Sequence, residues 1–287
     1  MYWAVPTLYN PATVGSDSAM NITAFDRMQW VGVKNAPQTF FASLDMPFKL
    51  KDRRWGAGAS ILNDKAGLFT TTQLEAQIAM NMKMRGGRLA LAIQGGMVNQ
   101  AFAGGDIFIP DGEAWDKNDD ALPSGTVSAM ALDLGFGAYY DKGVWYVGLA
   151  AQHLTGGAID LDEYAYSELE RTYFFHAGGN IPVKRTLLLL QPSVLVKSVI
   201  RNTQVDYTLR MLYNDKFIAG ISYRQEDAVI LMAGVKMGAI KLCYAYDIGI
   251  SPLSRASDGS HELMIGYSMH LDLDKKKQHP HKSIRIL

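Results

Sequence analysis

One stretch of the chain decides the fold: residues 72–100 read TQLEAQIAMNMKMRGGRLALAIQGGMVNQ. Every second position in its first half is apolar, and the alternation resumes after a Gly-Gly pair, giving the set Leu74, Ala76, Ile78, Met80, Met82, Met84, Leu89, Leu91 and Ile93. Several positions between them are polar, as at Glu75, Gln77 and Asn81. A period of two is typical of β-strands, whose side chains point alternately to opposite faces. The stretch therefore predicts two strands with one apolar and one polar face.

The same alternation continues along almost the whole chain, and a helical period of 3.6 persists nowhere. No linker divides the chain into two domains. We predict about 14 strands, with ends accurate to a few residues. They lie at residues 20–30, 38–48, 54–63, 72–84, 88–99, 126–140, 144–153, 171–182, 186–198, 203–213, 217–225, 228–236, 239–249 and 261–271.

The joints between these strands alternate in length. The tight joints are predicted near residues 51–52, 85–87, 141–143, 183–185, 214–216 and 237–238. In most of them Gly, Asn or Asp supplies the positive φ that short hairpin turns need. The long joints are predicted at about 64–71, 100–125, 154–170 and 250–260. An up-and-down meander puts alternate joints at opposite ends. One end of the sheet is therefore predicted to have only tight turns, and the other to carry the long loops.

Alternation alone also fits a soluble β-sandwich, so other features decide between the two. The predicted strands of about 10–13 residues exceed the ~5–6 usual in globular proteins and match the ~9–11 that cross a bilayer at a tilt. Short and long joints alternate as in outer-membrane barrels. Aromatic pairs flank the tight turns, as interfacial belts require: Phe48 with Trp55, Tyr140 with Trp145, and Tyr213 with Phe217. We therefore predict an all-β transmembrane antiparallel up-and-down β-barrel with short periplasmic turns and long extracellular loops.

A barrel of this size leaves space inside. Fourteen strands spaced ~4.8 Å apart and tilted ~40° give a backbone diameter of about 28 Å. We expect residues 1–19 to form an N-terminal segment, periplasmic or plugging the lumen, residues 20–271 to form the barrel, and residues 272–287 to form a basic periplasmic tail. Folded loops or a partner peptide are the other candidates for filling the lumen.

Short motifs at both ends of the chain resemble the PorP/SprF family of type IX secretion membrane proteins of the Bacteroidetes. The family's NPA turn is matched by Asn10-Pro11-Ala12, and its R-x-Q-W-x-G motif by the run from Arg27 through Gln29 and Trp30 to Gly32. Similar matches follow at residues 36–40, 56–67 and 282–287. The motifs are short but collinear, and they span nearly the whole chain.

This resemblance implies an outer-membrane component of the type IX secretion system, which supports the secretion or surface anchoring of adhesins and gliding-motility proteins. It also implies the partners, which are either periplasmic ring and lipoprotein components or the C-terminal domain of a secreted adhesin. A different class of function stays open beside it, an outer-membrane channel for a small or apolar solute. The formal net charge of zero gives no reason to expect a nucleic-acid partner.

Two groups of residues are candidates for partner binding. The tight-turn end is basic, and a docking surface for an acidic periplasmic partner is predicted at Arg53, Arg54, Arg85, Arg88, Lys142, Lys184, Arg185 and Lys216. The family motifs add a second group, Asn10, Pro11, Arg27, Gln29 and Trp30, whose members from the first strand end could hold the N-terminal segment or a loop. Ordinary solvated turns are the alternative for the first group.

No enzyme or cofactor is predicted, because the nucleophile, zinc-protease, P-loop and dinucleotide motifs do not occur. A barrel hydrolase could be built on paper from His153, His176 and Asp133. A more conventional expectation is that inward charges brace the lumen by ion pairs, drawn from Asp26, Asp45, Asp133, Asp206, Arg210 and Asp247. Only Cys243 is a cysteine, and the pair His279 and His281 has too few ligands for a metal site.

Overall fold

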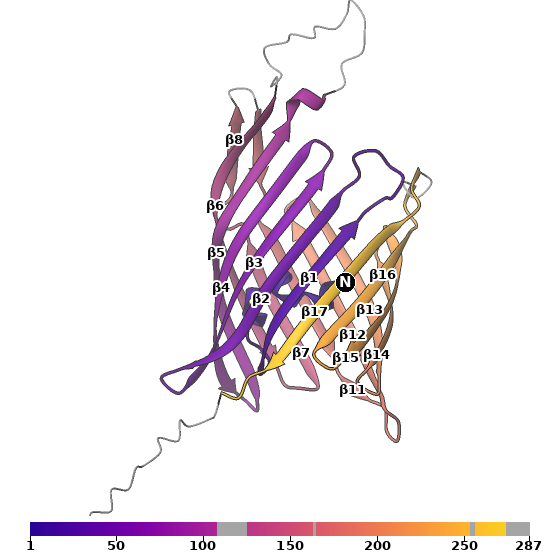
Figure 1. Ribbon diagram of the computed structural model, residues 1–287. Coiled ribbons are helices and arrows are strands. Elements are labelled where there is room, and N and C mark those ends of the chain that lie inside the picture. Colours follow the sequence, from indigo (N-terminus) through magenta and orange to yellow (C-terminus); the bar gives the residue numbers. More distant parts are fainter. Residues whose placement is uncertain (108–124, 163–164, 253–255, 274–287) are drawn as a thin grey trace, which may run out of the picture.

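The computed structural model describes residues 1–107, 125–162, 165–252 and 256–273. Its main sheet of 15 strands closes into a barrel (Figure 1), because β12 pairs with β13 on one side and with β10 on the other. β10 and β11 are two parts of one interrupted strand, so the barrel has 14 strands, as predicted. The strands are β1 (Ala19–Met28), β2 (Gln38–Leu50), β3 (Arg53–Ala66), β4 (Phe69–Met84), β5 (Gly87–Ala103), β6 (Thr126–Asp141), β7 (Trp145–Gln152), β10 (Thr172–Gly179), β11 (Ile181–Pro182), β12 (Leu188–Val199), β13 (Asn202–Tyr213), β14 (Phe217–Arg224), β15 (Ala228–Met237), β16 (Ile240–Gly249) and β17 (Ser260–His270).

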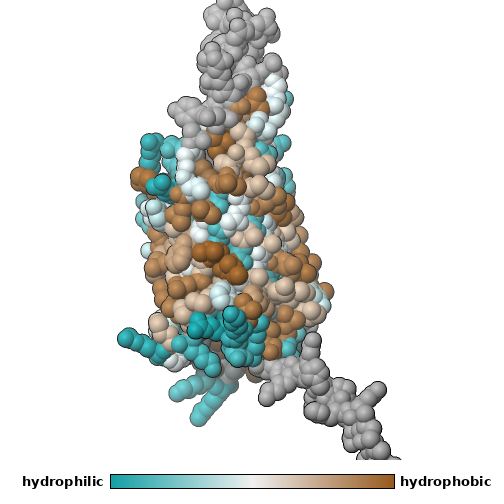
Figure 2. Space-filling model, turned by 90° about the vertical axis from the view of Figure 1, so that its left-hand side faces the viewer, coloured by the Kyte–Doolittle hydropathy of each residue, from teal (hydrophilic) through white to brown (hydrophobic). Residues whose placement is uncertain are grey.

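The two faces of the wall follow the alternation in the sequence. Leu74 and Ile78 of β4 are 48% and 40% exposed on the outer surface, whereas Glu75 and Gln77 between them are 9% and 4% exposed and face the lumen. Figure 2 shows apolar residues around the middle of the visible face and hydrophilic residues gathered at its lower end. Lipid offers no hydrogen-bond partner for backbone N–H groups. Closing the sheet gives the backbone groups of every strand a partner on a neighbouring strand within the membrane. Among the described residues, no helix is long and apolar enough to cross a membrane.

The tight joints have two to five residues, and each contains left-handed backbone. Lys51 and Asp52 have φ of 48° and 62°, and Asn214 and Asp215 have φ of 53° and 52°. Positive φ at both central residues gives the turn whose twist matches that of the flanking strands. We call this the tight-turn end, where β1 begins and β17 ends, and the opposite one the long-loop end. In outer-membrane barrels the short turns are periplasmic and the long loops extracellular.

One of the predicted long joints is wrong, and another is long but forms a hairpin of its own. The joint predicted at 64–71 is wrong, because only Gly67 and Leu68 separate β3 from β4. Both strands continue as a hairpin past the alternating stretch, where polar residues lie on both faces and the period no longer marks a strand. The joint at 154–170 contains a separate hairpin, β8 (Gly157–Asp162) with β9 (Ala165–Leu169). The joint at 250–260 is long as predicted, and most of the joint at 100–125 lies outside the described residues.

The strand predicted at 171–182 is interrupted. The ladder pairs Gly178 with Ser193 and resumes only where Ile181 pairs with Leu190. Pro192 on the partner strand has no N–H to donate, so one ladder bond cannot form there. The Gln191 side chain instead donates to Asn180 Oδ1 at 2.7 Å.

Candidate functional site

The first 14 residues lie inside the barrel and are called the lumen segment below. They form three short helical turns, η1 (Tyr2–Ala4), α1 (Pro6–Tyr9) and η2 (Pro11–Thr13). Proline stands at the first position of α1 and of η2, where its fixed φ suits a helix start and no N–H is needed. The segment is packed: Val5 is 2% exposed, and Ala12 and Val14 are 0% exposed. The barrel is therefore filled at mid-height by its own chain.

Asn10 fastens the lumen segment to the wall. Its Oδ1 accepts from the N–H of Ala12 at 2.9 Å, which caps η2. Its Nδ2 donates to the carbonyl of Ala138 at 3.0 Å and faces Nε2 of His176 at 3.0 Å. A further carbonyl, that of Leu149, lies 3.3 Å from the same nitrogen. Asn10 thus joins the segment to β6, β7 and β10 at one point.

Two wall glycines make room for this contact. A Cβ added at Gly137 would lie 2.3 Å from Asn10 Oδ1, and one at Gly148 would lie 2.0 Å from His176 Nε2. Real Cβ atoms do not approach so closely, so a side chain at either position would displace the contact. The His176 ring stacks on Tyr139, with centroids 5.6 Å apart and planes 11° from parallel. Glycine in these strands lets the lumen segment approach the wall closely.

The chain leaves the lumen at the tight-turn end through a second fastening. The N–H of Gly15 donates to Asp45 Oδ2 at 2.9 Å. Arg54 donates to the carbonyl of Asp17, and Arg88 donates to the carbonyl of Ser16. Two guanidinium groups predicted to bind a partner therefore hold residues 16–17 of the chain itself.

An ionic network lies at the upper side of the lumen segment. Arg27 contacts Asp247 at 2.7 Å and Glu262 at 3.2 Å. Arg224 contacts Asp206 at 3.2 Å and Asp247 at 3.3 Å. The three carboxylates are almost fully buried, with side chains at most 7% exposed. Buried charges in such a low-dielectric space must be paired, which explains the shared carboxylates.

An apolar core inside the lumen was not predicted. Inward-facing apolar residues pack against Met1, Ala4 and Val5, and they include Phe25, Phe41, Ile230, Met232, Cys243 and Met264. The signal was present in the sequence, because these positions are apolar in strands whose outward positions are apolar too. A barrel strand that is apolar on both faces indicates that something covers its inner face.

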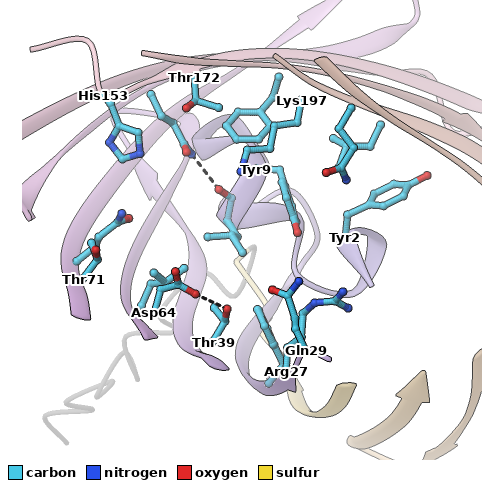
Figure 3. A pocket seen from close by; sticks show the side chains of 18 of the residues that line it. Tyr2, Tyr9, Arg27, Gln29, Thr39, Asp64, Thr71, His153, Thr172 and Lys197 are labelled. Atoms are coloured by element: carbon cyan, nitrogen blue, oxygen red, sulfur yellow. Dashed lines mark hydrogen bonds between the residues drawn. The ribbon is translucent and has the colours of Figure 1, made fainter. Parts of the chain in front are cut away.

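A vestibule of about 510 Å³ lies between the lumen segment and the long-loop end (Figure 3). Its floor includes Tyr2, Leu8 and Tyr9 of the lumen segment. Its volume is in the range of about 300–1,000 Å³ that ligand sites usually have.

The wall of the vestibule is polar above and apolar below. Cross-strand pairing joins one inward row over five neighbouring strands, the polar arc Arg27, Thr39, Asp64, Thr71 and Gln100. The row beneath it in the same register is mostly apolar and consists of Phe25, Phe41, Leu62, Gln73 and Val98. A ligand in the vestibule would therefore meet hydrogen-bonding groups and apolar surface on one wall.

The predicted rim residues are partly brought together. Arg27 and Gln29 both line the vestibule. Trp30 has φ of 47°, and its N–H donates to Ser260 Oγ at 3.1 Å, so it turns the chain just beyond β1. Asn10 and Pro11 belong to the lumen segment itself and are not among the residues that line the vestibule. The predicted basic residues other than Arg54 and Arg88 lie exposed at the tight-turn end: Arg53, Arg85, Lys142, Lys184, Arg185 and Lys216.

The inward charges were predicted well with one exception. Asp26 faces outward, where Gln38 donates to it at 3.2 Å, because Phe25 and Arg27 occupy the inward positions of β1. Asp45 accepts a hydrogen bond from the N–H of Gly15, whereas Asp206 and Asp247 form ion pairs with Arg224 and Arg27 of the barrel wall. Arg210 forms no ion pair with another described residue; its guanidinium carbon lies 4.0 Å above the Trp3 ring.

The three residues named for a hydrolase are not assembled as one site. His153 Nδ1 lies 2.9 Å from Asp133 Oδ2. His176 instead contacts Asn10 and Tyr139. Within the described ranges, no group of three or more His, Cys, Asp or Glu residues could hold a metal ion. His279 and His281 lie outside those ranges.

Residues 1–267 match the family described as type IX secretion system membrane protein PorP/SprF. The chain belongs to this family. A PorP/SprF barrel with a lipid-facing apolar surface is an outer-membrane protein, as predicted. No curated protein matches the sequence.

Solved structures resemble this PorP/SprF protein in fold. The CymD monoaromatic hydrocarbon channel has a TM-score of 0.55 at 10% identity, covering 94% of each chain. A TodX monoaromatic hydrocarbon channel with the deltaS2 mutation has a TM-score of 0.51 at 10% identity, again covering 94% of each chain. The outer membrane protein Omp33 of Acinetobacter baumannii has a TM-score of 0.47 at 6% identity, covering 90% of this chain and 100% of its own. At such identities the likeness shows the fold alone.

Proposed function

We propose that this PorP/SprF protein is a non-enzymatic component of the type IX secretion system that supports the secretion or surface anchoring of cargo. The family match supports the assignment to this system, and one observation supports a scaffold role within it. The lumen is occupied by the chain's own N-terminal segment, which is hydrogen-bonded to β6, β7 and β10. Such a filled barrel suits a protein that holds another protein better than one that passes solutes.

The absence of an assembled nucleophile supports the non-enzymatic assignment. His153 is the histidine placed as a general base would be, paired with a buried carboxylate. A serine, threonine or cysteine hydrolase also needs a hydroxyl or thiol within hydrogen-bond reach of that histidine. In the described part of the chain the only side chain hydrogen-bonded to His153 is that of Asp133.

The exposed basic turns are proposed to dock an acidic periplasmic partner, either a ring component or a lipoprotein. The proposal is restricted to the side chains that the lumen segment does not engage, namely Arg53, Arg85, Lys142, Lys184, Arg185 and Lys216. Reversing the charge of Lys184 and Arg185 should reduce co-purification of ring components. The matched control reverses Arg201, which lies in the turn between β12 and β13 at the other end. Equal co-purification with both variants would refute docking at this surface.

The main test is made in cells. Deleting the gene should remove cargo from the cell surface while the outer membrane stays intact, and restoring the full chain should bring the cargo back. Surface labelling of intact cells measures the cargo, and leakage of a periplasmic enzyme measures integrity. Normal surface cargo in the deletion strain would refute the proposal.

A channel for a small or apolar solute is the second candidate. The observation favouring it is the similarity in fold to channels named for monoaromatic hydrocarbons. A planar bilayer separates the two candidates for ionic solutes, and uptake of toluene into vesicles does so for apolar ones. We expect neither steady current nor uptake above that of empty vesicles. Either signal from the full chain would favour transport.

A further inference from the structure

Lys197 is the exceptional charge of the vestibule. It lies on the inward face of β12 next to buried Leu195, yet it is exposed, because the vestibule gives it access to water (Figure 3). Arg27 and Arg224 each contact at least two carboxylates. Across the described ranges no hydrogen bond or ion pair reaches the Lys197 ammonium; Asp64 attracts it only from beyond ion-pair distance. Lys197 is therefore the one cation of the vestibule that no described carboxylate contacts, in a lining that also includes Asp64, Glu168, Asp206 and Glu262.

Amide and hydroxyl groups near this cation also have unused hydrogen-bonding capacity. Gln73, Gln100 and Thr71 line the vestibule. Their side chains bond to no other described residue, whereas buried Gln77 and Gln94 bond to each other at 3.1 Å. Glutamine offers both a donor and an acceptor, which is what a peptide backbone needs. These groups form a neutral surface that suits an amide ligand.

The lower wall supplies apolar contact. Leu62 and Val98 face the vestibule from one side, and Phe174 and Leu195 face it from the other. Burying an aliphatic side chain there would remove apolar surface of both partners from water. The vestibule thus combines a cation, neutral amides and apolar surface within one cavity.

We propose that the vestibule binds an extended peptide segment whose carboxylate contacts Lys197. A sugar acid would use the cation and the amides but leave the apolar wall uncovered. A simple aliphatic acid would use the cation and the apolar wall but leave the amides without partners. A peptide uses all three, with its backbone on Gln73 and Gln100 and an aliphatic side chain against the apolar wall. This inference rests on the proposed cargo-holding function and names the chemistry of the ligand.

Binding of a matched pair of probes tests the proposal. The probes are acetyl-leucyl-threonyl-leucine with a free carboxylate and the same peptide as its C-terminal amide, titrated calorimetrically into the full chain in phospholipid nanodiscs. A charge-assisted hydrogen bond should make the acid bind roughly tenfold more tightly than the amide. The variant Lys197→Met should weaken binding of the peptide acid by about the same factor and leave binding of the peptide amide unchanged. Lys184→Met makes the same chemical change at the tight-turn end and should alter neither.

Two further measurements identify the class of ligand. Octanoate should compete poorly with the peptide acid, because it cannot use the amide groups. The variant Gln73→Leu should weaken binding of the peptide acid and leave binding of octanoate unchanged. Equal binding of acid and amide, an unchanged affinity in Lys197→Met, or no binding at all would overturn the proposal. Competition by octanoate as strong as by the peptide acid would overturn the assignment to a peptide.

These results are separable from the test of cellular function. If the probes bind but the deletion strain has normal surface cargo, the peptide site is supported and the role in cargo anchoring is refuted. If deletion removes the surface cargo and the Lys197→Met variant restores it fully, the role in cargo anchoring is supported. The use of this site for cargo is then refuted.

Discussion

Replacing Asn10 with alanine should loosen the lumen segment while leaving the barrel closed. Asn10 is fully buried, and the substitution removes the cap of η2 and the contacts with the wall. It leaves two buried groups without a partner, the N–H of Ala12 and Nε2 of His176. Each such group costs about 1–3 kcal/mol. Allowing for partial relaxation, we expect docking of the segment to weaken by about 2–4 kcal/mol.

That loss changes the population of the released segment. Since about 1.4 kcal/mol is a factor of ten, the released fraction should rise roughly 30- to 700-fold. Hydrogen exchange followed by mass spectrometry measures this fraction directly, because amides exchange through the open form. Peptides covering residues 1–14 should exchange faster by at least about 30-fold, whereas those from β4 should be unchanged. The control Asn202→Ala alters an exposed asparagine at the start of β13 and should change neither.

Two results would refute the reasoning. Unchanged protection of residues 1–14 in Asn10→Ala would mean that other contacts hold the segment without the asparagine. Equal acceleration in the lumen segment and in β4 would mean that the segment is part of one cooperative unit with the barrel and does not detach alone.

Three further substitutions probe the wall, each read as the urea midpoint of unfolding in lipid vesicles. Gly148→Ala places a Cβ 2.0 Å from the neighbouring imidazole and should cost about 2 kcal/mol, whereas Gly95→Ala, whose nearest atom is 3.7 Å away, should cost nothing measurable; equal midpoints would contradict the close approach. Ile78→Arg puts a charge on the outward face in the middle of β4 and should cost about 2–4 kcal/mol, against about 0–1 for Leu50→Arg near the tight-turn end; equal losses would argue against contact with lipid. Arg27→Met leaves two buried carboxylates short of a partner and should cost about 3 kcal/mol; an unaltered midpoint would show that the ionic network does not stabilise the barrel.

Much of the wall could be predicted from the sequence, because each strand reports its own two environments. The period of two across residues 72–100 assigns Leu74 and Ile78 to one face and Glu75 and Gln77 to the other without reference to any other strand. The turn residues Asp52, Asn214 and Asp215 likewise adopt left-handed backbone more readily than most residues. These are local signals, and the structure confirms them.

The errors occur where a local signal is absent. Asp26 was predicted to face inward because β1 mixes polar and apolar residues, so its pattern does not show which face points to the lumen. That face is set by Phe25, which packs inside the lumen. The joint at 64–71 was predicted too long because strands that extend beyond the bilayer meet water on both faces. Neither feature can be read from periodicity.

By itself, the sequence determined a closed, lipid-facing barrel, its number of strands, and which end carries the tight turns. Only the tertiary structure decided what fills that barrel. Asn10 meets its wall partners 128, 139 and 166 residues further along the chain. The rows that form the vestibule exist only through the register of successive strands. Alternation tells each side chain which way to point, but the closure of the sheet decides which inward side chains face one another across the lumen.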